Sequence, residues 1–166
     1  MKKFLVAFVV SGVLFTSCVK DHIGHGGENE DVDVLALTFS KIGGFTNGSG
    51  DEGFAEISAF DSKTKKLFVV NPIENEVSVW DITTPSSAVK LASIILTGTP
   101  NSVAVFDGIL AVAVENVNKQ LNGTVQTYNT ETQALLNTYN VGALPDMVTF
   151  SPNGEFIISA NEGEPN

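Results

Sequence analysis

Residues 56–61 read EISAFD, and two similar stretches follow them, SVAVFD at 102–107 and DMVTFS at 146–151. Their first residues lie 46 and then 44 positions apart, from 56 to 102 and from 102 to 146. Each stretch is a short strand-like run, and each is followed by a turn and a second apolar run. A unit of about 45 residues that recurs along a chain indicates a repeat architecture.

Each unit contains up to four strand-like runs separated by turn residues. Second strands are predicted at 66–70, 109–114 and 156–160, third strands at 77–82 and 124–128, and fourth strands at 91–96 and 135–141. Residues 35–42 also fit the place of a fourth strand. Asp107-Gly108 and Asn122-Gly123 predict turns between strands.

A four-stranded sheet has two apolar faces, and both are buried only where the sheet stacks between neighbouring sheets. The repeat therefore predicts an all-β fold, a partial β-propeller with about two and a half four-stranded blades, over residues 34–166. A β-sandwich also has short strands and regular turns, and it is the alternative interpretation.

The N-terminus resembles a bacterial lipoprotein signal. A basic start and an apolar run at 4–15, too short to span a bilayer, predict a signal peptide over residues 1–17. The sequence FTSC at 15–18 resembles a lipobox, in which the cysteine is lipidated, and Cys18 is the only cysteine of the chain. An ordinary cleaved signal followed by a chance cysteine is the alternative. Residues 18–33 are polar and glycine-containing, which predicts a flexible tether between the membrane and an exported domain.

The charge of the chain bears on its partners. The net charge is −10, and removal of Lys2 and Lys3 with the signal changes it to −12, with seven lysines against 19 acids. The chain contains no arginine. Phosphate contacts need basic side chains, so we expect no nucleic-acid partner. A cation, or a neutral or cationic ligand, suits an acidic surface better.

Several motifs resemble one family. KLFVVN at 66–71, GALPDMVTF at 142–150 and ANEGEPN at 160–166 are similar to the choice-of-anchor I proteins, which include mesenchyme-specific cell-surface glycoproteins. The resemblance covers residues 35–166 and implies an exported seven-bladed propeller of the YVTN or WD40-like type. Together with the lipoprotein-like signal, this predicts a lipid-anchored protein at the outer membrane or cell surface. Bacterial members are often labelled alkaline phosphatases. The family pattern continues beyond this sequence, so we expect the chain to be the N-terminal part of a propeller.

Polar residues recur where each unit enters its first strand and leaves its second, and in propellers these places lie near the central channel. Their carboxylate and amide oxygens are ligands that Ca²⁺ prefers, which predicts a divalent-cation site. The proposed metal ligands are Glu56, Glu115, Asp146, Asn161 and Glu162, in a wider polar ring that includes Asn71, Glu74, Asn101 and Asn116. The alternative is that these residues merely terminate strands and keep the surface soluble.

Two classes of function follow from the sequence. The first is a membrane-anchored binding or scaffold module whose partner is a protein, a glycan or a phosphoester, with Ca²⁺ or another divalent cation as a cofactor. The second is a metal-dependent phosphoesterase, similar to alkaline phosphatases or phytases, whose other catalytic residues lie in further blades.

Overall fold

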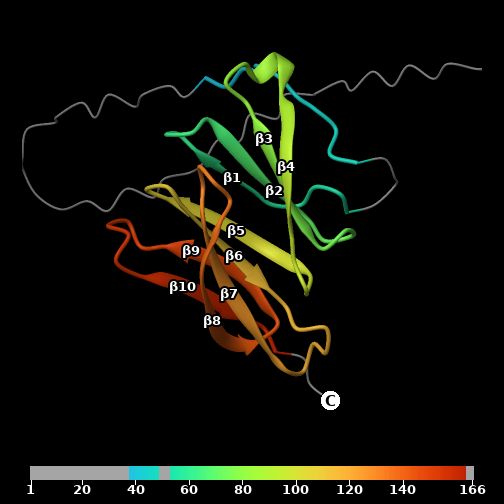
Figure 1. Cartoon of the computed structure of the whole chain (residues 1–166), viewed down its shortest axis with the longest axis vertical. Coiled ribbons are helices and arrows are strands. Elements are labelled where there is room, and N and C mark those ends of the chain that lie inside the picture. Colours follow the sequence, from blue (N-terminus) through green and yellow to red (C-terminus); the bar gives the residue numbers. More distant parts are fainter. Residues whose placement is uncertain (1–37, 49–52, 164–166) are drawn as a thin grey trace, which may run out of the picture. The chain divides into compact units, whose positions relative to one another are not determined.

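The computed structural model describes residues 38–48 and 53–163 (Figure 1). The chain divides into two units between Thr38 and Phe39, and only the unit from Phe39 onward is described below. The predicted signal peptide, Cys18 and the predicted tether lie outside the described residues. Within those residues, no helix has the length and apolar character needed to cross a membrane.

The described residues form ten antiparallel strands in three sheets. Sheet 1 contains β1 (Ser58–Asp61), β2 (Lys66–Asn71), β3 (Glu76–Asp81) and β4 (Val89–Ile95). Sheet 2 contains β5 (Pro100–Phe106), β6 (Ile109–Val114), β7 (Asn122–Asn129) and β8 (Leu135–Ala143), and β9 (Pro145–Phe150) pairs with β10 (Ile157–Asn161). In each sheet the strands pair in the order of the chain, and a 3-10 turn at Pro85–Ser87 precedes β4. The all-β prediction is confirmed, and the arrangement is consistent with part of a β-propeller.

The second strand of sheet 2, β6, is buried on both of its faces. On β6, Leu110, Val112 and Val114 pack into a core shared with sheet 1. The intervening Ala111 and Ala113 pack into a second core with Val148 of β9. Side chains alternate between the two faces of a strand, so a strand that is apolar at every position is buried from both sides. Stacking of neighbouring sheets therefore stabilises this fold.

The first strands of the three sheets run side by side in the same direction. Near their starts, Asn101 Nδ2 donates a hydrogen bond of 3.2 Å to Pro145 O, and near their ends Lys63 forms an ion pair with Asp107. We call the end of the sheets where β4 connects to β5 and β8 to β9 the connection face. The opposite end, where turns join β1 to β2, β5 to β6 and β9 to β10, is called the hairpin face. In Figure 1 the stacked sheets follow one another from green to red.

The register of the repeat differs by one residue from the sequence alignment. Ala59 pairs with Phe68 and packs against the first core, whereas Ala104 pairs with Ala111 and packs against the second. The alignment of EISAFD with SVAVFD places Ala59 opposite Val105. In the structure each alanine faces the next sheet, so Ala59 corresponds instead to Ala104, 45 residues later. The β1–β2 turn has four residues (62–65) and the β5–β6 turn has two (107–108). A shift of one residue exchanges the two faces of a strand, so the spacing alone misassigned the faces.

The predicted strand at 35–42 is wrong in its described part, because residues 38–42 form no strand. Phe39 and Ile42 are 90% and 71% exposed, and a strand needs a hydrogen-bonded neighbour, which they lack within the described residues. Further along, the ring of Phe45 stacks on Trp80 with centroids 4.1 Å apart, and Asn47 Oδ1 accepts a hydrogen bond of 3.1 Å from Trp80 Nε1. This segment therefore covers Trp80 of sheet 1.

Candidate functional site

The five predicted ligands all lie at the connection face. Antiparallel pairing places the start of each first strand beside the end of the second strand of the same sheet. Glu56 precedes β1, Glu115 follows β6, Asp146 lies in β9, Asn161 ends β10 and Glu162 follows it. The repeat therefore brings these residues to one end of the sheets, as the sequence analysis expected.

Asn101 connects sheet 2 to β9 at this face. Its Nδ2 donates hydrogen bonds to Glu115 Oε2, at 3.4 Å, and to Pro145 O, at 3.2 Å. The Glu115 side chain is only 10% exposed, and Lys119 Nζ lies 3.9 Å from its Oε2. Pro145 directly precedes Asp146, so the Asn101 amide connects Glu115 with the strand that carries Asp146. Asn101 belongs to the wider polar ring, but its bridging role depends on contacts that the sequence does not reveal.

The other predicted ligands are held by their backbones. Glu162 N donates to Leu144 O at 2.9 Å, and Glu56 N donates to Val70 O at 3.3 Å. The side chains of Glu56, Asp146, Asn161 and Glu162 are exposed. Among residues 38–48 and 53–163, no three or more His, Cys, Asp and Glu side chains gather in a way that could hold a metal ion. Cation binding by the five residues therefore stays a prediction.

A cavity of about 180 Å³ lies beside Glu115 on the connection face. It is lined by residues of the β4–β5 and β6–β7 connections and of the start of β7, among them Thr97, Asn116 and Thr124. Gly98 permits the close approach of these two connections, because a Cβ at this position would lie 2.0 Å from Glu115 O. Glu115 N also donates to Thr99 O at 2.9 Å. The cavity is thus bounded by backbone that has little room to move.

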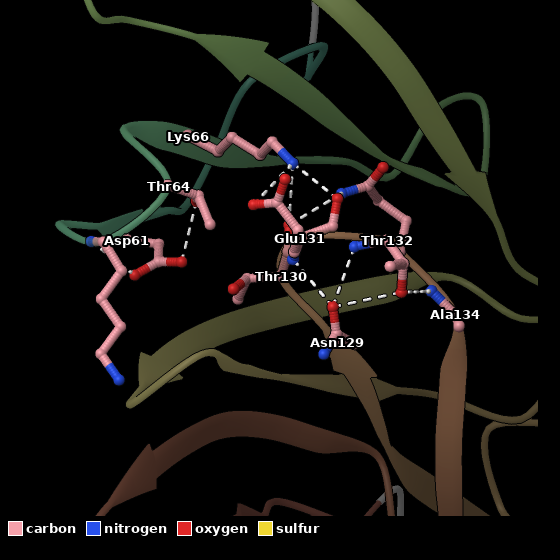
Figure 2. Close-up of polar contacts among 10 residues, drawn as sticks. Asp61, Thr64, Lys66, Asn129, Thr130, Glu131, Thr132 and Ala134 are labelled. Atoms are coloured by element: carbon pink, nitrogen blue, oxygen red, sulfur yellow. Dashed lines mark hydrogen bonds and ion pairs between the residues drawn. The ribbon is translucent and has the colours of Figure 1, made fainter.

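A second polar cluster lies on the hairpin face and joins sheet 1 to sheet 2 (Figure 2). Lys66 Nζ donates to Thr130 O at 3.2 Å and to Glu131 O at 2.7 Å, both in the β7–β8 turn. Its distance from Glu131 Oε2 is 3.8 Å. The turn itself is held by Asn129, whose Oδ1 accepts hydrogen bonds from the backbone of Glu131 and Thr132. Lys66 therefore attaches the second strand of sheet 1 to an ordered turn of sheet 2.

Asp61 completes this cluster as a buried carboxylate. Only 2% of the residue is exposed, and burial alone would raise the pKa of its carboxyl group. Hydrogen bonds from the side chains of Thr130 and Thr64 and from the backbone of Lys63 and Thr64 outweigh this effect and hold the pKa below its ordinary value. Asp61 is therefore ionised at neutral pH and serves as an acceptor between the two sheets.

The choice-of-anchor I domain model matches residues 56–166, which is more than half of the chain. The chain belongs to the choice-of-anchor I family. Family membership points to a surface-associated, β-rich module. No curated protein matches the sequence.

Two solved structures resemble this choice-of-anchor I domain in fold. Hydrazine synthase of Kuenenia stuttgartiensis has a TM-score of 0.57 and 21% identity, over 66% of this chain and 30% of that one. Sqt1 of Saccharomyces cerevisiae has a TM-score of 0.50 and 14% identity, over 64% of this chain and 28% of that one. The chain thus spans about 30% of the length of the structures that it matches. At these identities, the similarity concerns the fold alone.

Proposed function

We propose that this choice-of-anchor I chain is an exported binding module, held at the outer membrane or cell surface by lipid on Cys18, with its ligand site on the connection face. The observation that carries the ligand site is the double hydrogen bond of Asn101 to Glu115 and Pro145. The Asn101 side chain thereby holds Glu115 of sheet 2 close to the start of β9, at the connection face of the stacked sheets. Binding residues are commonly presented in this way, on loops and strand ends that a rigid framework positions.

The chemistry of this face favours a cationic ligand. Glu115 is nearly buried, and Asp146 lies exposed in the adjoining strand. A carboxylate that is largely removed from water interacts more strongly with a nearby positive charge than an exposed one does. The mature chain, without Lys2 and Lys3, has a net charge of −12, which further attracts cations to the surface. A divalent cation such as Ca²⁺, which takes oxygen ligands, is the ligand that we propose.

The membrane anchor can be tested through Cys18. In cells that are fed radioactive palmitate, we expect the wild-type chain to be labelled and to sediment with membranes. The C18S variant should lose the label and appear in the soluble exported fraction, because it lacks the thiol that carries the lipid. A C18S protein that keeps both the label and the membrane association would contradict the proposed anchor.

The ligand site can be tested by calorimetric titration of Ca²⁺ into the full chain. We expect the substitutions E115Q and D146N to weaken binding by about tenfold or more each, which corresponds to about 1.4 kcal/mol. The matched control is E155Q, which removes an exposed carboxylate from the β9–β10 turn on the hairpin face and should bind as the wild type does.

Two results would count against a cation-binding module. The first is equal Ca²⁺ binding by E115Q, D146N and E155Q, which would mean that the connection face is not the site. The second is Ca²⁺-dependent hydrolysis of p-nitrophenyl phosphate by the chain, which would favour the phosphoesterase alternative. Each measurement uses the same purified protein, so the two functions are compared directly.

A further inference from the structure

The segment that precedes β1 meets sheet 1 at the hairpin face (Figure 1). The 3-10 turn Pro85–Ser87, between β3 and β4, lies at this face, because Asp81 at the end of β3 pairs with Lys66 at the start of β2. A Cβ at Gly43 would overlap Pro85 O, so the backbone of Gly43 lies directly against this turn. The chain that precedes Gly43 therefore leaves sheet 1 at the hairpin face.

Side-chain contacts hold this exit point in place. Phe45, two residues after Gly43, stacks on Trp80 with ring centroids 4.1 Å apart. Asn47 is 6% exposed, accepts a hydrogen bond of 3.1 Å from Trp80 Nε1, and donates one of 2.5 Å to Phe54 O. Aromatic stacking and buried hydrogen bonds both favour one arrangement of the backbone. The segment is therefore attached to sheet 1 on either side of Phe45, and its N-terminal end stays at the hairpin face.

The length of chain between the proposed anchor and this exit point limits how far the domain lies from the membrane. Cys18 lies 25 positions before Gly43. A flexible tether of this length has a root-mean-square end-to-end distance of about 25–30 Å. The connection face lies about 20 Å beyond the hairpin face, because strands such as β2 and β6 have six residues and rise about 3.3 Å per residue. A lipid on Cys18 therefore holds the hairpin face nearer to the membrane, on average, than the connection face.

The distribution of lysines favours the same orientation. Among the described residues, five acids lie at the turns and strand ends of each face, but the hairpin face also has three lysines and the connection face only one. Glu76 and Lys90 pair with each other along sheet 1 and are counted at neither face. An anionic lipid surface attracts lysines and repels acids, so it repels the connection face more strongly. The lysines are Lys63, Lys65 and Lys66 at the hairpin face and Lys119 at the connection face.

We propose that the hairpin face is the surface of this domain that faces the lipid headgroups, and that the connection face points away from the membrane. The inference rests on the lipid anchor proposed above, but it does not depend on Ca²⁺ binding. In this orientation Glu115 and Asp146 are open to ligands from the surrounding medium, and the membrane does not cover them.

Energy transfer from a fluorophore on the domain to a labelled lipid headgroup tests this orientation. The full lipidated chain is reconstituted into vesicles of phosphatidylcholine and phosphatidylglycerol. Cys18 is the only cysteine, and lipid occupies its thiol, so the fluorophore attaches only to an introduced cysteine. The variants S62C and E155C carry the label at exposed positions of the hairpin face, and T97C and V117C carry it at exposed positions of the connection face. Transfer should be about twofold more efficient from the hairpin face, which lies about 20 Å nearer to the lipid.

A second set of variants tests the role of the segment itself. The double substitution F45A/N47A removes both contacts with Trp80 and should decrease the difference in transfer between the two faces. The matched control F39A/S40A changes two exposed positions of the same segment and should keep the full difference. Circular dichroism shows whether both double variants are folded.

The possible failures are distinguishable. If the vesicle-bound chain transfers energy equally from both faces, or more efficiently from the connection face, the orientation is wrong although the anchor stands. If the wild-type chain does not bind the vesicles, or binds no better than C18S, the proposed anchor is wrong and this inference fails with it. A folded F45A/N47A chain that keeps the full difference would overturn the role of the segment in setting the orientation.

Discussion

Replacing Lys66 by methionine should lower the free energy of unfolding by about 2–3 kcal/mol. The Lys66 side chain is 12% exposed, and its ammonium donates to two carbonyl oxygens of the β7–β8 turn. A hydrogen bond to a charged group contributes about 1.5–3 kcal/mol. The Thr130 bond is partly buried, whereas the Glu131 bond is exposed and water can replace it. Methionine keeps the apolar stem, so the loss concerns mainly the ammonium.

The matched control is the substitution of Glu131 by glutamine. The Glu131 side chain is 72% exposed and its Oε2 lies 3.8 Å from Lys66 Nζ. An exposed ion pair of this kind contributes between about zero and 1 kcal/mol. Because glutamine keeps the backbone carbonyl that accepts from Lys66, E131Q should change the free energy of unfolding by less than about 0.5 kcal/mol.

Urea denaturation of the full chain measures both variants. Trp80 is the only tryptophan and is buried against Phe45, so its fluorescence reports unfolding of sheet 1. The midpoint should decrease in K66M while the slope stays constant, which marks a change in stability rather than in the surface exposed. If E131Q is as destabilising as K66M, the ion pair and not the carbonyl bonds joins the sheets. A K66M protein as stable as the wild type would refute the reasoning entirely.

Two further predictions concern Asp61 and Gly98. Hydrogen bonds hold the pKa of the Asp61 carboxyl below its ordinary value of 3.8, so its stabilising effect is complete above that pH and is lost as pH falls through the lower folded value. The stability difference between the wild type and D61N, measured by urea denaturation, should therefore be smaller near pH 3 than at pH 7, and a constant difference would contradict this. The substitution G98A should destabilise by about 1–3 kcal/mol or more, because its Cβ would meet Glu115 O. In the same assay G44A should be nearly neutral, since a Cβ at Gly44 meets only the flexible Lys41 side chain, and equal effects would refute the steric argument.

The strands were largely predictable because their pattern is local. Residues 109–114 and 77–82 were expected as strands, and they correspond to β6 and β3. A run that is apolar at each position, such as ILAVAV, indicates a strand buried from both sides, and sheet 2 confirms this. The register was not predictable to the residue, because the β1–β2 turn is two residues longer than the β5–β6 turn.

The candidate site was predictable in its position but not in its contacts. Each unit places polar residues at the same strand ends, so the alignment alone brought Glu56, Glu115 and Asp146 to one face. The alignment made Phe60 and Phe106 equivalent, and this equivalence is wrong. In the structure Phe60 pairs with Leu67 and Phe106 with Ile109, which places them on opposite faces of their sheets.

The sequence by itself determined the all-β class, the repeating unit of about 45 residues, the acidic charge and the family motifs. These properties depend on neighbouring residues and on composition. Only the tertiary structure decided which groups of different sheets meet, such as Asn101 with Pro145 and Lys66 with Thr130, which are 44 and 64 residues apart. The physical reason is that such contacts depend on turn lengths and on how stacked sheets pack, and a change of one residue in a turn moves a side chain to the other face.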